Sequence, residues 1–378
     1  MQIELPISKS IANRWLMLQA IHGDELMPVS DSMPDDVQIL HRALTTLHNT
    51  TQSYITLHLS NCGTAMRFLT AYAAQLENRV TILDGVERMH HRPIGQLVDA
   101  LREIGADIEY LGEEGFPPLR IKGCILDKHR IVTINNPQST QFVSALLLVG
   151  TNVQTDSTSP YITLTRTLIE QYALASFNED SATSVRRSGG NKISSVENKI
   201  NLDFLSEANR SPIFLERDWS SAAFWYEYVA LHGGEITLPG LSRDSLQGDK
   251  VVADIFAHLG VQTHYTTGGV VISSSPLHPT PSTLHYDFVA CPDLYPAVAL
   301  TCERLGIELH ATGVESLPLK ESDRLRAVAE HRTDSDHRMA MALLIAGYEV
   351  DDTACISKSY PQFLEHFHHL QESNCSNV

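Results

Sequence analysis

The sequence lacks paired cysteines and any long apolar run. Its 6 cysteines are scattered with no Cys-x-x-Cys spacing, so neither a disulfide framework nor a zinc knuckle is indicated. No uninterrupted run approaches the ~20 apolar residues that span a bilayer. Residues 1–6 have neither the basic start nor the apolar core of a secretory signal. We therefore expect a soluble, cytoplasmic protein with reduced thiols and no membrane partner.

Positive charge is also scarce. The chain has 28 Lys and Arg residues against 45 Asp and Glu residues, a formal net charge of -17. This balance argues against nucleic acid as a partner, although an acidic chain can still gather its few cations in one cleft. A length of 378 residues is too great for one compact core and predicts two domains.

Short β-rich runs alternate with amphipathic helices along the chain. Residues 54–67 are typical of a strand, a glycine-containing turn and a helix. A helix predicted over 96–104 stops at Gly105 and returns as a strand at 106–110, and residues 251–265 repeat this order. Two distant copies indicate two halves built from the same unit.

Two further stretches stand out. Ser10 is predicted to be a helix N-cap, with Lys9 beside it and Arg14 one turn further on, and a helix start of this kind favours anions. Residues 178–210, rich in Ser, Asn and charge, are predicted to form a surface excursion within the first half.

Six ordered motifs then extend across almost the whole chain. They resemble those of the 5-enolpyruvylshikimate-3-phosphate (EPSP) synthases, a family of enolpyruvyl transferases. The motifs are Ser8-Lys9-Ser10 with Asn13-Arg14, Asn61-x-Gly63-Thr64-Ala65-Met66-Arg67, Arg92-Pro93-Ile94-Gly95, Ser139-Thr140-Gln141-Phe142, Lys320-Glu321-Ser322-Asp323-Arg324 and Asp336-His337-Arg338-Met339-Ala340-Met341.

The resemblance implies a fold. It predicts two similar α/β domains, each a threefold repeat of a βαβαββ-like unit (an inverted α/β barrel), hinged by two crossovers near Ser8 and near Glu216. Residues 9–216 would form an inserted domain on the shikimate 3-phosphate side. Residues 1–8 and 217–378 would form the second domain, with residues on the phosphoenolpyruvate side.

It also implies a reaction. Phosphoenolpyruvate would be joined to the 5-hydroxyl of shikimate 3-phosphate with release of phosphate, without metal or organic cofactor, in a monomer that binds these two small molecules. Asp293 resembles the base for the hydroxyl and Glu321 the acid for the methylene carbon, with Lys9 as a possible partner. The residues expected around phosphoenolpyruvate are Lys9, Asn61, Gly63, Thr64, Arg92, Gln141, Arg324, Arg338 and Lys358. Those expected around shikimate 3-phosphate are Lys9, Ser10, Arg14, Ser139, Thr140, Gln141, Thr158, Tyr161, Asp293, Ser316 and Lys320.

The chain departs from the family pattern in residues and in spacing. Residues that differ from the usual type are Ile7, Cys62, Phe68, Thr158 and Ser316, and spacings are short near Asn49, Asn152 and His331. Two alternatives stay open: a sister transferase acting on a nucleotide sugar, whose reactive-cysteine loop is not found here, and a non-catalytic homologue that binds anionic metabolites. The retained Lys9, Asp293, Glu321 and Lys358 disfavour the second alternative, whereas the short spacings favour it.

Overall fold

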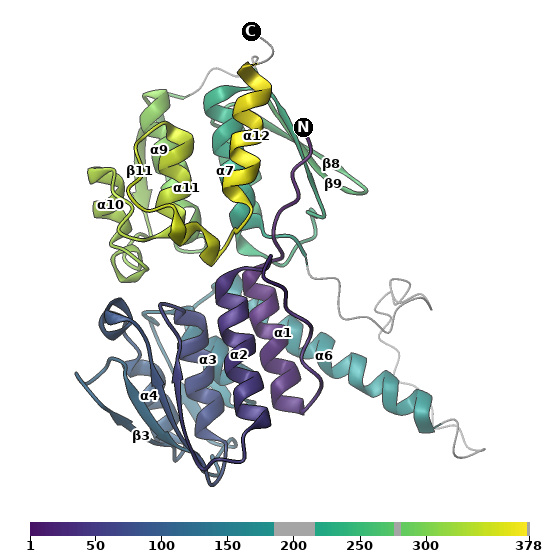
Figure 1. Cartoon of the computed structure of the whole chain (residues 1–378), viewed down its shortest axis with the longest axis vertical. Helices are drawn as coiled ribbons and strands as arrows, with labels where there is room; N and C mark the ends of the chain where they lie inside the picture. Colours follow the sequence, from purple (N-terminus) through teal and green to yellow (C-terminus); the bar gives the residue numbers. More distant parts are fainter. Residues whose placement is uncertain (185–215, 276–280, 376–378) are drawn as a thin grey trace.

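The computed structural model describes residues 1–184, 216–275 and 281–375. Figure 1 shows two lobes stacked along the long axis of the molecule. The first lobe has a hydrophobic core drawn from residues between 11 and 172, and the second lobe has a separate core drawn from residues 3 and 5 and from residues between 219 and 370. The chain therefore starts in the second lobe, forms the first lobe, and returns to complete the second lobe.

The two passages between the lobes run side by side. Ile7 and Arg217 form an antiparallel bridge, and the amide of Ser8 donates to the carbonyl of Glu216 at 2.7 Å. The side-chain amide of Gln247 donates to the Glu216 carboxylate at 2.9 Å and to the Arg217 carbonyl at 2.8 Å. The crossovers expected near Ser8 and Glu216 thus form one hydrogen-bonded connection.

One complete βαβαββ unit lies in the first lobe. Its strand order is β1-β2-β4-β3, with β1 parallel to β2 and β4 antiparallel to both β2 and β3. Buried Ile55 and Leu57 alternate with exposed residues along β1, as the period of a half-buried strand requires. The unit consists of β1 (Tyr54–His58), α3 (Gly63–Ala74), β2 (Val80–Asp84), the 3-10 helix η1 (Glu87–His91), α4 (Gly95–Glu103), β3 (Asp107–Tyr110) and β4 (Leu119–Lys122).

The second lobe repeats this unit. Gln2 makes a parallel bridge to Thr237 in β7 and takes the place of the first strand, and the order β7-β9-β8 matches β2-β4-β3. The elements are α7 (Trp219–His232), β7 (Glu235–Pro239), η2 (Gly248–Val251), α8 (Val252–Ala257), β8 (Val261–Thr266) and β9 (Gly269–Ser274). The sequence echo is confirmed, because α4-β3 and α8-β8 hold the same position in the two units.

Each lobe contains two further helix pairs with fewer strands in the described part of the chain. In the first lobe, β5 (Ile131–Thr133) and β6 (Asn152–Gln154) are a parallel pair with α5 (Thr140–Leu148) and α6 (Pro160–Ser184), and α1 (Lys9–His22) accompanies α2 (Asp35–Asn49). In the second, β10 (Thr283–Asp287) and β11 (Glu308–Thr312) are a parallel pair with η3 (Pro292–Leu294), α9 (Tyr295–Leu305), η4 (Leu317–Leu319) and α10 (Arg324–Glu330). The last pair is α11 (His337–Ala346) and α12 (Phe363–Cys375), with η5 (Ala354–Lys358) between them. Three helix pairs per lobe agree with the expected threefold repeat.

The short spacing after His331 is a tight turn between α10 and α11. His331, Asp334 and Ser335 have φ of 51°, 46° and 56°, in the left-handed region that residues other than glycine rarely adopt. The Thr333 hydroxyl donates to the carboxylate of Asp351, and the turn ends at Asp336, which caps α11. No strand separates α10 from α11, so the unit is shortened at this position.

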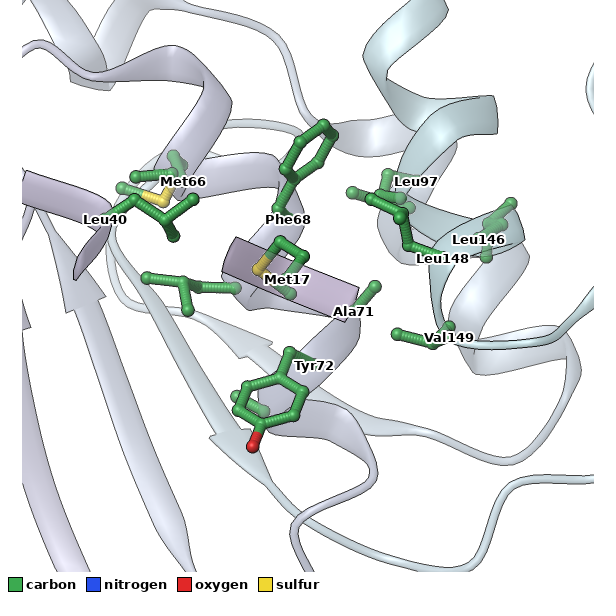
Figure 2. Close-up of a cluster of buried hydrophobic side chains, with 14 of the residues drawn as sticks. Met17, Leu40, Met66, Phe68, Ala71, Tyr72, Leu97, Leu146, Leu148 and Val149 are labelled. Carbon is green, nitrogen blue, oxygen red and sulfur yellow. The ribbon is translucent and has the colours of Figure 1, made fainter. Parts of the chain in front are cut away.

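Helix α3 lies at the centre of the first lobe, and every one of its residues is buried. Figure 2 shows its side chains packed against those of neighbouring helices. The labelled residues are Met17, Leu40, Met66, Phe68, Ala71, Tyr72, Leu97, Leu146, Leu148 and Val149. Each large buried side chain stabilises the fold by about 1.5–3 kcal/mol. Because these side chains lie along the whole of α3, they fix the helix in the lobe and with it the position of Gly63, its first residue.

Two local predictions need correction. Ser10 is not the N-cap of α1: the helix begins at Lys9, Ser8 precedes it, and no side chain caps it, because Ser10 already lies inside the first turn. Part of the predicted excursion is helical, since α6 continues to Ser184, and residues 185–210 lie outside the described residues.

Candidate active site

The loops after β1 and β2 meet at one edge of the first lobe. These strands are parallel, so their carboxyl ends lie together and bring Gly63 beside Arg92. A Cβ atom on Gly63 would lie 2.6 Å from Cζ and Nη1 of Arg92 and 2.3 Å from Nη1 of Arg67. Only glycine lets the two guanidinium groups approach the start of α3 so closely.

These two guanidinium groups are buried, and several of their N–H donors are unpaired. Nη1 of Arg92 donates to the Asn61 carbonyl at 3.2 Å, and Nη2 of Arg67 donates to the Pro93 carbonyl at 3.2 Å. Among the described residues, Nε and Nη1 of Arg67 and Nε of Arg92 have no hydrogen-bond partner. Burial and the like charge of Arg92 lower the pKa of Arg67 to about 9. Unpaired donors on adjacent cations favour a bound anion.

The second lobe places a carboxylate against this edge. Glu321 lies 3.2 Å from Nζ of Lys358, 3.0 Å from Nη2 of Arg324 and 4.0 Å from Nη2 of Arg92. Burial alone would raise the pKa of Glu321, but the charges of Lys358, Arg92 and Arg324 outweigh it and hold that pKa well below its usual value. Glu321 is therefore ionised at neutral pH.

A second carboxylate shares one of these cations. Asp293 lies 2.8 Å from Nη1 of Arg324, 2.9 Å from Nη2 of Arg338 and 3.3 Å from Nζ of Lys320. Burial again acts to raise its pKa, yet these cations, led by Arg338, hold the pKa well below the usual range. Both predicted catalytic carboxylates thus lie in one network centred on Arg324.

Arg324 is held by Asp336, which opens the last of the six motifs but was not predicted to be a site residue. Asp336 accepts from Nε of Arg324 at 2.8 Å, from the Ser322 hydroxyl at 3.1 Å and from the backbone amide of Arg338 at 3.0 Å. The same carboxylate therefore caps α11 and orients the Arg324 guanidinium. Its position just before an apolar helix was the available signal.

Lys9 reaches the network from the first lobe. Its ammonium lies 3.0 Å from the carboxylate of Asp36, and its side chain is 15% exposed. Burial alone would lower the pKa of Lys9, but nearby carboxylates, mainly Asp36 with Glu321 and Asp293 beyond it, raise that pKa. Asp36, which belongs to none of the sequence motifs, thus keeps Lys9 charged.

Other predicted site residues lie on the first-lobe side of the candidate active site. Nε2 of Gln141 donates to the Thr64 hydroxyl at 2.9 Å, and Ser139 and Thr140 precede it at the start of α5. Arg14 is engaged within the protein: its guanidinium donates to the Thr165 hydroxyl at 2.7 Å and to the Ser10 carbonyl at 2.8 Å.

Tyr161 makes a contact between the lobes. Its hydroxyl donates to Asp249 at 3.3 Å, and the Ser220 hydroxyl donates to the other oxygen of Asp249. Burial, the charge of Asp293 and other nearby carboxylates raise the pKa of Asp249 to about 6. Two predicted residues are less well connected: Thr158 is exposed before α6 and Ser316 is half-buried before η4, and among the described residues no side-chain hydrogen bond joins either to the network.

A pocket of about 770 Å³ lies where the lobes meet. Asn61 and Arg88 line it from the first lobe, and Glu321 and Lys358 line it from the second. Nζ of Lys358 donates to the Asn61 carbonyl at 2.9 Å, so the two walls are joined. Pockets of this size are typical of small-molecule sites.

The described residues contain neither a candidate metal site nor a candidate membrane span. No group of three or more His, Cys, Asp or Glu side chains in that part of the chain is arranged to hold a metal ion. No helix there is long and apolar enough to cross a membrane.

Fold and site together define a class of protein: a two-lobed α/β protein that gathers cations and ionised carboxylates where its lobes meet. Comparison with known proteins is more specific. The family model for EPSP synthase (3-phosphoshikimate 1-carboxyvinyltransferase) matches residues 35–331 and 328–367. The chain belongs to the EPSP synthase family.

Individual relatives agree. The chain is 36% identical to the 3-phosphoshikimate 1-carboxyvinyltransferase of Bacteroides fragilis, covering 96% of this chain and 93% of the relative, and 30% identical to that of Vibrio cholerae, covering 98% and 96%. The EPSP synthase structure from Acinetobacter baumannii matches with a TM-score of 0.62 at 20% identity, covering 97% of this chain and 94% of that one, and confirms the fold.

The same alignments show that this chain is shortened. They extend over 408 and 432 positions, more than the 378 residues of this chain, so the chain lacks segments that its relatives have. The tight turn after His331 is one place where the structure continues directly from helix to helix.

Proposed function

We propose that the chain transfers the enolpyruvyl group of phosphoenolpyruvate to the 5-hydroxyl of shikimate 3-phosphate and releases phosphate. The observation that carries the proposal is the network in which two ionised carboxylates, Glu321 and Asp293, lie among cations from both lobes. Two substrates that each bear phosphate and carboxylate groups repel one another, so a shared cationic site is what their reaction needs.

Phosphoenolpyruvate would bind between Gly63 and the cations of the network. Arg92 and Lys9 would approach it from the first lobe, and Arg338 and Lys358 from the second. The unpaired donors of Arg92 beside Gly63 support this assignment, and buried charge-assisted hydrogen bonds are strong.

The reaction would proceed by addition and elimination. The 5-hydroxyl oxygen bonds to C2 of phosphoenolpyruvate and gives its proton to a base, while C3 accepts a proton and becomes a methyl group. In the second step the methyl group loses a proton, the double bond re-forms and phosphate leaves C2. Asp293 would act as the base on the hydroxyl, and Glu321 would exchange the proton with C3.

A proton donor must first carry a proton, yet the pKa of Glu321 in the substrate-free protein is well below its usual value. Its low value results from Lys358, Arg92 and Arg324. A substrate anion that binds these cations neutralises their charge, so the pKa of Glu321 would rise when phosphoenolpyruvate binds. Substrate binding would thereby allow Glu321 to take up the proton that it later transfers.

Shikimate 3-phosphate would bind mainly to the first lobe, residues 9–216. Ser139, Thr140 and Gln141 would receive its phosphate at the start of α5, where backbone amides favour anions. Tyr161 would contact it beside Asp249, and the other expected residues are Ser10, Arg14, Thr158, Ser316 and Lys320. Residues 1–8 and 217–378 would carry Asp293 and Glu321 toward it, in a monomer that acts in the cytoplasm without nucleic acid.

Identification of the product tests this mechanism. In deuterated water the purified chain, given both substrates, should yield a product with vinyl methylene signals by proton NMR and with deuterium at that methylene. A product without deuterium would contradict the methyl intermediate.

The non-catalytic alternative is disfavoured by the complete network of Lys9, Asp293, Glu321 and Lys358.

A further inference from the structure

Arg88 joins the lobes through backbone carbonyls. It lies in η1 of the first lobe, half-buried, and its Nε donates to the carbonyl of Glu321 at 2.9 Å. Its Nη2 donates to the carbonyl of Lys320 at 2.9 Å and to that of Pro318 at 3.4 Å. One guanidinium group thus holds three carbonyls of a single second-lobe loop, residues 318–321.

The loop that Arg88 holds carries two side chains of the site. Lys320 pairs with Asp293, and Glu321 pairs with Lys358 and Arg324. Local backbone bonds also shape this loop, since the amide of Lys320 donates to Leu317. Those bonds lie within the second lobe and do not fix the loop relative to the first.

Arg88 is also rigidly connected to the first-lobe cations. The amide of Arg92 donates to the carbonyl of Met89 at 3.1 Å, and the Met89 side chain is fully buried. Arg88 and Arg92 therefore stand at opposite ends of one short helical turn. Any movement of the 318–321 loop away from Arg88 also moves Glu321 away from Arg92.

We propose that Arg88 is a positioning residue that latches the second lobe to the first and sets the distance between Glu321 and the first-lobe cations. The proposal rests on the proposed function for its kinetic consequences. Arg88 lines the pocket between the lobes, but its Nε and Nη2 already donate to main-chain carbonyls, so we assign it a positioning role and not contact with either substrate. Arginine suits this task since its planar fork reaches several acceptors at once, whereas lysine has a compact ammonium at the end of a flexible stem.

The latch predicts unequal effects on the two substrates. Shikimate 3-phosphate is proposed to bind mainly first-lobe residues, so its binary affinity should not depend on the latch. Phosphoenolpyruvate is proposed to bind cations of both lobes, so its binding should depend on the latch. In Arg88→Met we expect kcat/KM for phosphoenolpyruvate to fall at least tenfold, with the Kd of shikimate 3-phosphate within twofold of wild type. Arg88→Lys should recover only part of the loss.

Arg79 provides a matched control. Its guanidinium also donates to backbone carbonyls, to Leu47 at 2.6 Å and to Thr50 at 3.1 Å, but both partners lie in the first lobe. Arg79→Met removes equivalent hydrogen bonds without touching the interface between the lobes. It should lower thermal stability while leaving kcat/KM within twofold of wild type.

The experiment combines steady-state phosphate release, calorimetric titration with shikimate 3-phosphate, thermal melts and amide hydrogen exchange of residues 318–321 in the substrate-free protein. The expected result is selective loss for phosphoenolpyruvate and faster exchange of that loop in Arg88→Met, with neither change in Arg79→Met. Unchanged kinetics in Arg88→Met would overturn the latch, and so would equal loss for both substrates with a lowered melting temperature.

A wild-type protein without activity would instead refute the proposed function. The exchange measurement then decides on the latch by itself, because it needs no turnover. Faster exchange at 318–321 in Arg88→Met would support the connection, and unchanged exchange would overturn it.

Discussion

Replacing Gly63 by alanine tests the geometry of the anion site directly. The added Cβ would lie 2.6 Å from Cζ and Nη1 of Arg92, whereas ordinary contact begins at 3.4 Å. The Arg92 guanidinium must therefore retreat by about 0.8 Å, from 2.6 to 3.4 Å. Arg67, whose Nη1 is 2.3 Å from the same position, must move further.

The magnitude follows from the hydrogen bonds at risk. One hydrogen bond to a charged group contributes about 1.5–3 kcal/mol, and about 1.4 kcal/mol corresponds to a factor of ten. We expect KM for phosphoenolpyruvate to rise about 10- to 100-fold in Gly63→Ala if one such bond from Arg92 is misaligned. The fold should persist, because alanine is a better helix former than glycine by about 1 kcal/mol and Gly63 is the first residue of α3.

Phosphate release at saturating shikimate 3-phosphate, with phosphoenolpyruvate varied, measures the effect. Gly268→Ala is the control, since a Cβ at that position meets nothing within 4 Å and its φ lies outside the left-handed region. A KM for phosphoenolpyruvate within twofold of wild type in Gly63→Ala would refute the placement of the substrate against Arg92.

Three further predictions follow from the same network. Glu321→Gln should bind both substrates but turn over at least about 100-fold more slowly, since an amide cannot exchange the proton; unchanged turnover in single-turnover kinetics would disprove this role. Lys9→Met should abolish activity and lower the melting temperature, because it leaves the buried Asp36 carboxylate unpaired; Asp36→Asn in the same chain should restore the melting temperature and not the activity. The pKa values of Asp293 and Glu321 lie well below their usual values. The ionised carboxylates therefore stabilise the folded protein above about pH 4, and this contribution is lost as the pH falls through their folded-state pKa values. Thermal melts should therefore depend less on acid pH in Asp293→Asn than in wild type.

The sequence predicted the parts of the molecule that depend on local pattern. Alternation over residues 54–59 corresponds to β1, the glycine turn after it leads into α3, and the echo between 96–110 and 251–265 reflects two equivalent units. The family resemblance also indicated side chains that converge, including Asp293, Glu321 and Arg324. Period and turn chemistry are local properties, and a family motif adds long-range information to them.

The residues that sequence reasoning missed act through distant partners. Arg88 binds main-chain carbonyls, which leave no mark on residue type, and its partners lie in the other lobe. Asp36 and Asp249 are buried acids whose roles depend on Lys9 and Tyr161. The N-cap prediction for Ser10 was wrong by two residues, because the helix starts where the crossover ends rather than at the hydroxyl.

The shortened units also needed the structure. A short spacing near His331 does not say whether the remaining residues form a strand, a loop or a turn. The turn that is found needs three residues in the left-handed region, none of them glycine. Histidine and aspartate adopt this region more often than most other residues, but residue preference alone does not predict three such residues in one turn, which hydrogen bonds of Thr333 and Asp336 anchor to Asp351 and Arg324.

Phosphate release from phosphoenolpyruvate by the purified chain is the most direct test of the central claim, measured with shikimate 3-phosphate, with the nucleotide sugar used by the sister transferase, and with no acceptor. Release only with shikimate 3-phosphate is the predicted result. Absence of release with either acceptor, from a protein that melts cooperatively, would contradict the claim and indicate a homologue that has lost catalysis along with its missing segments.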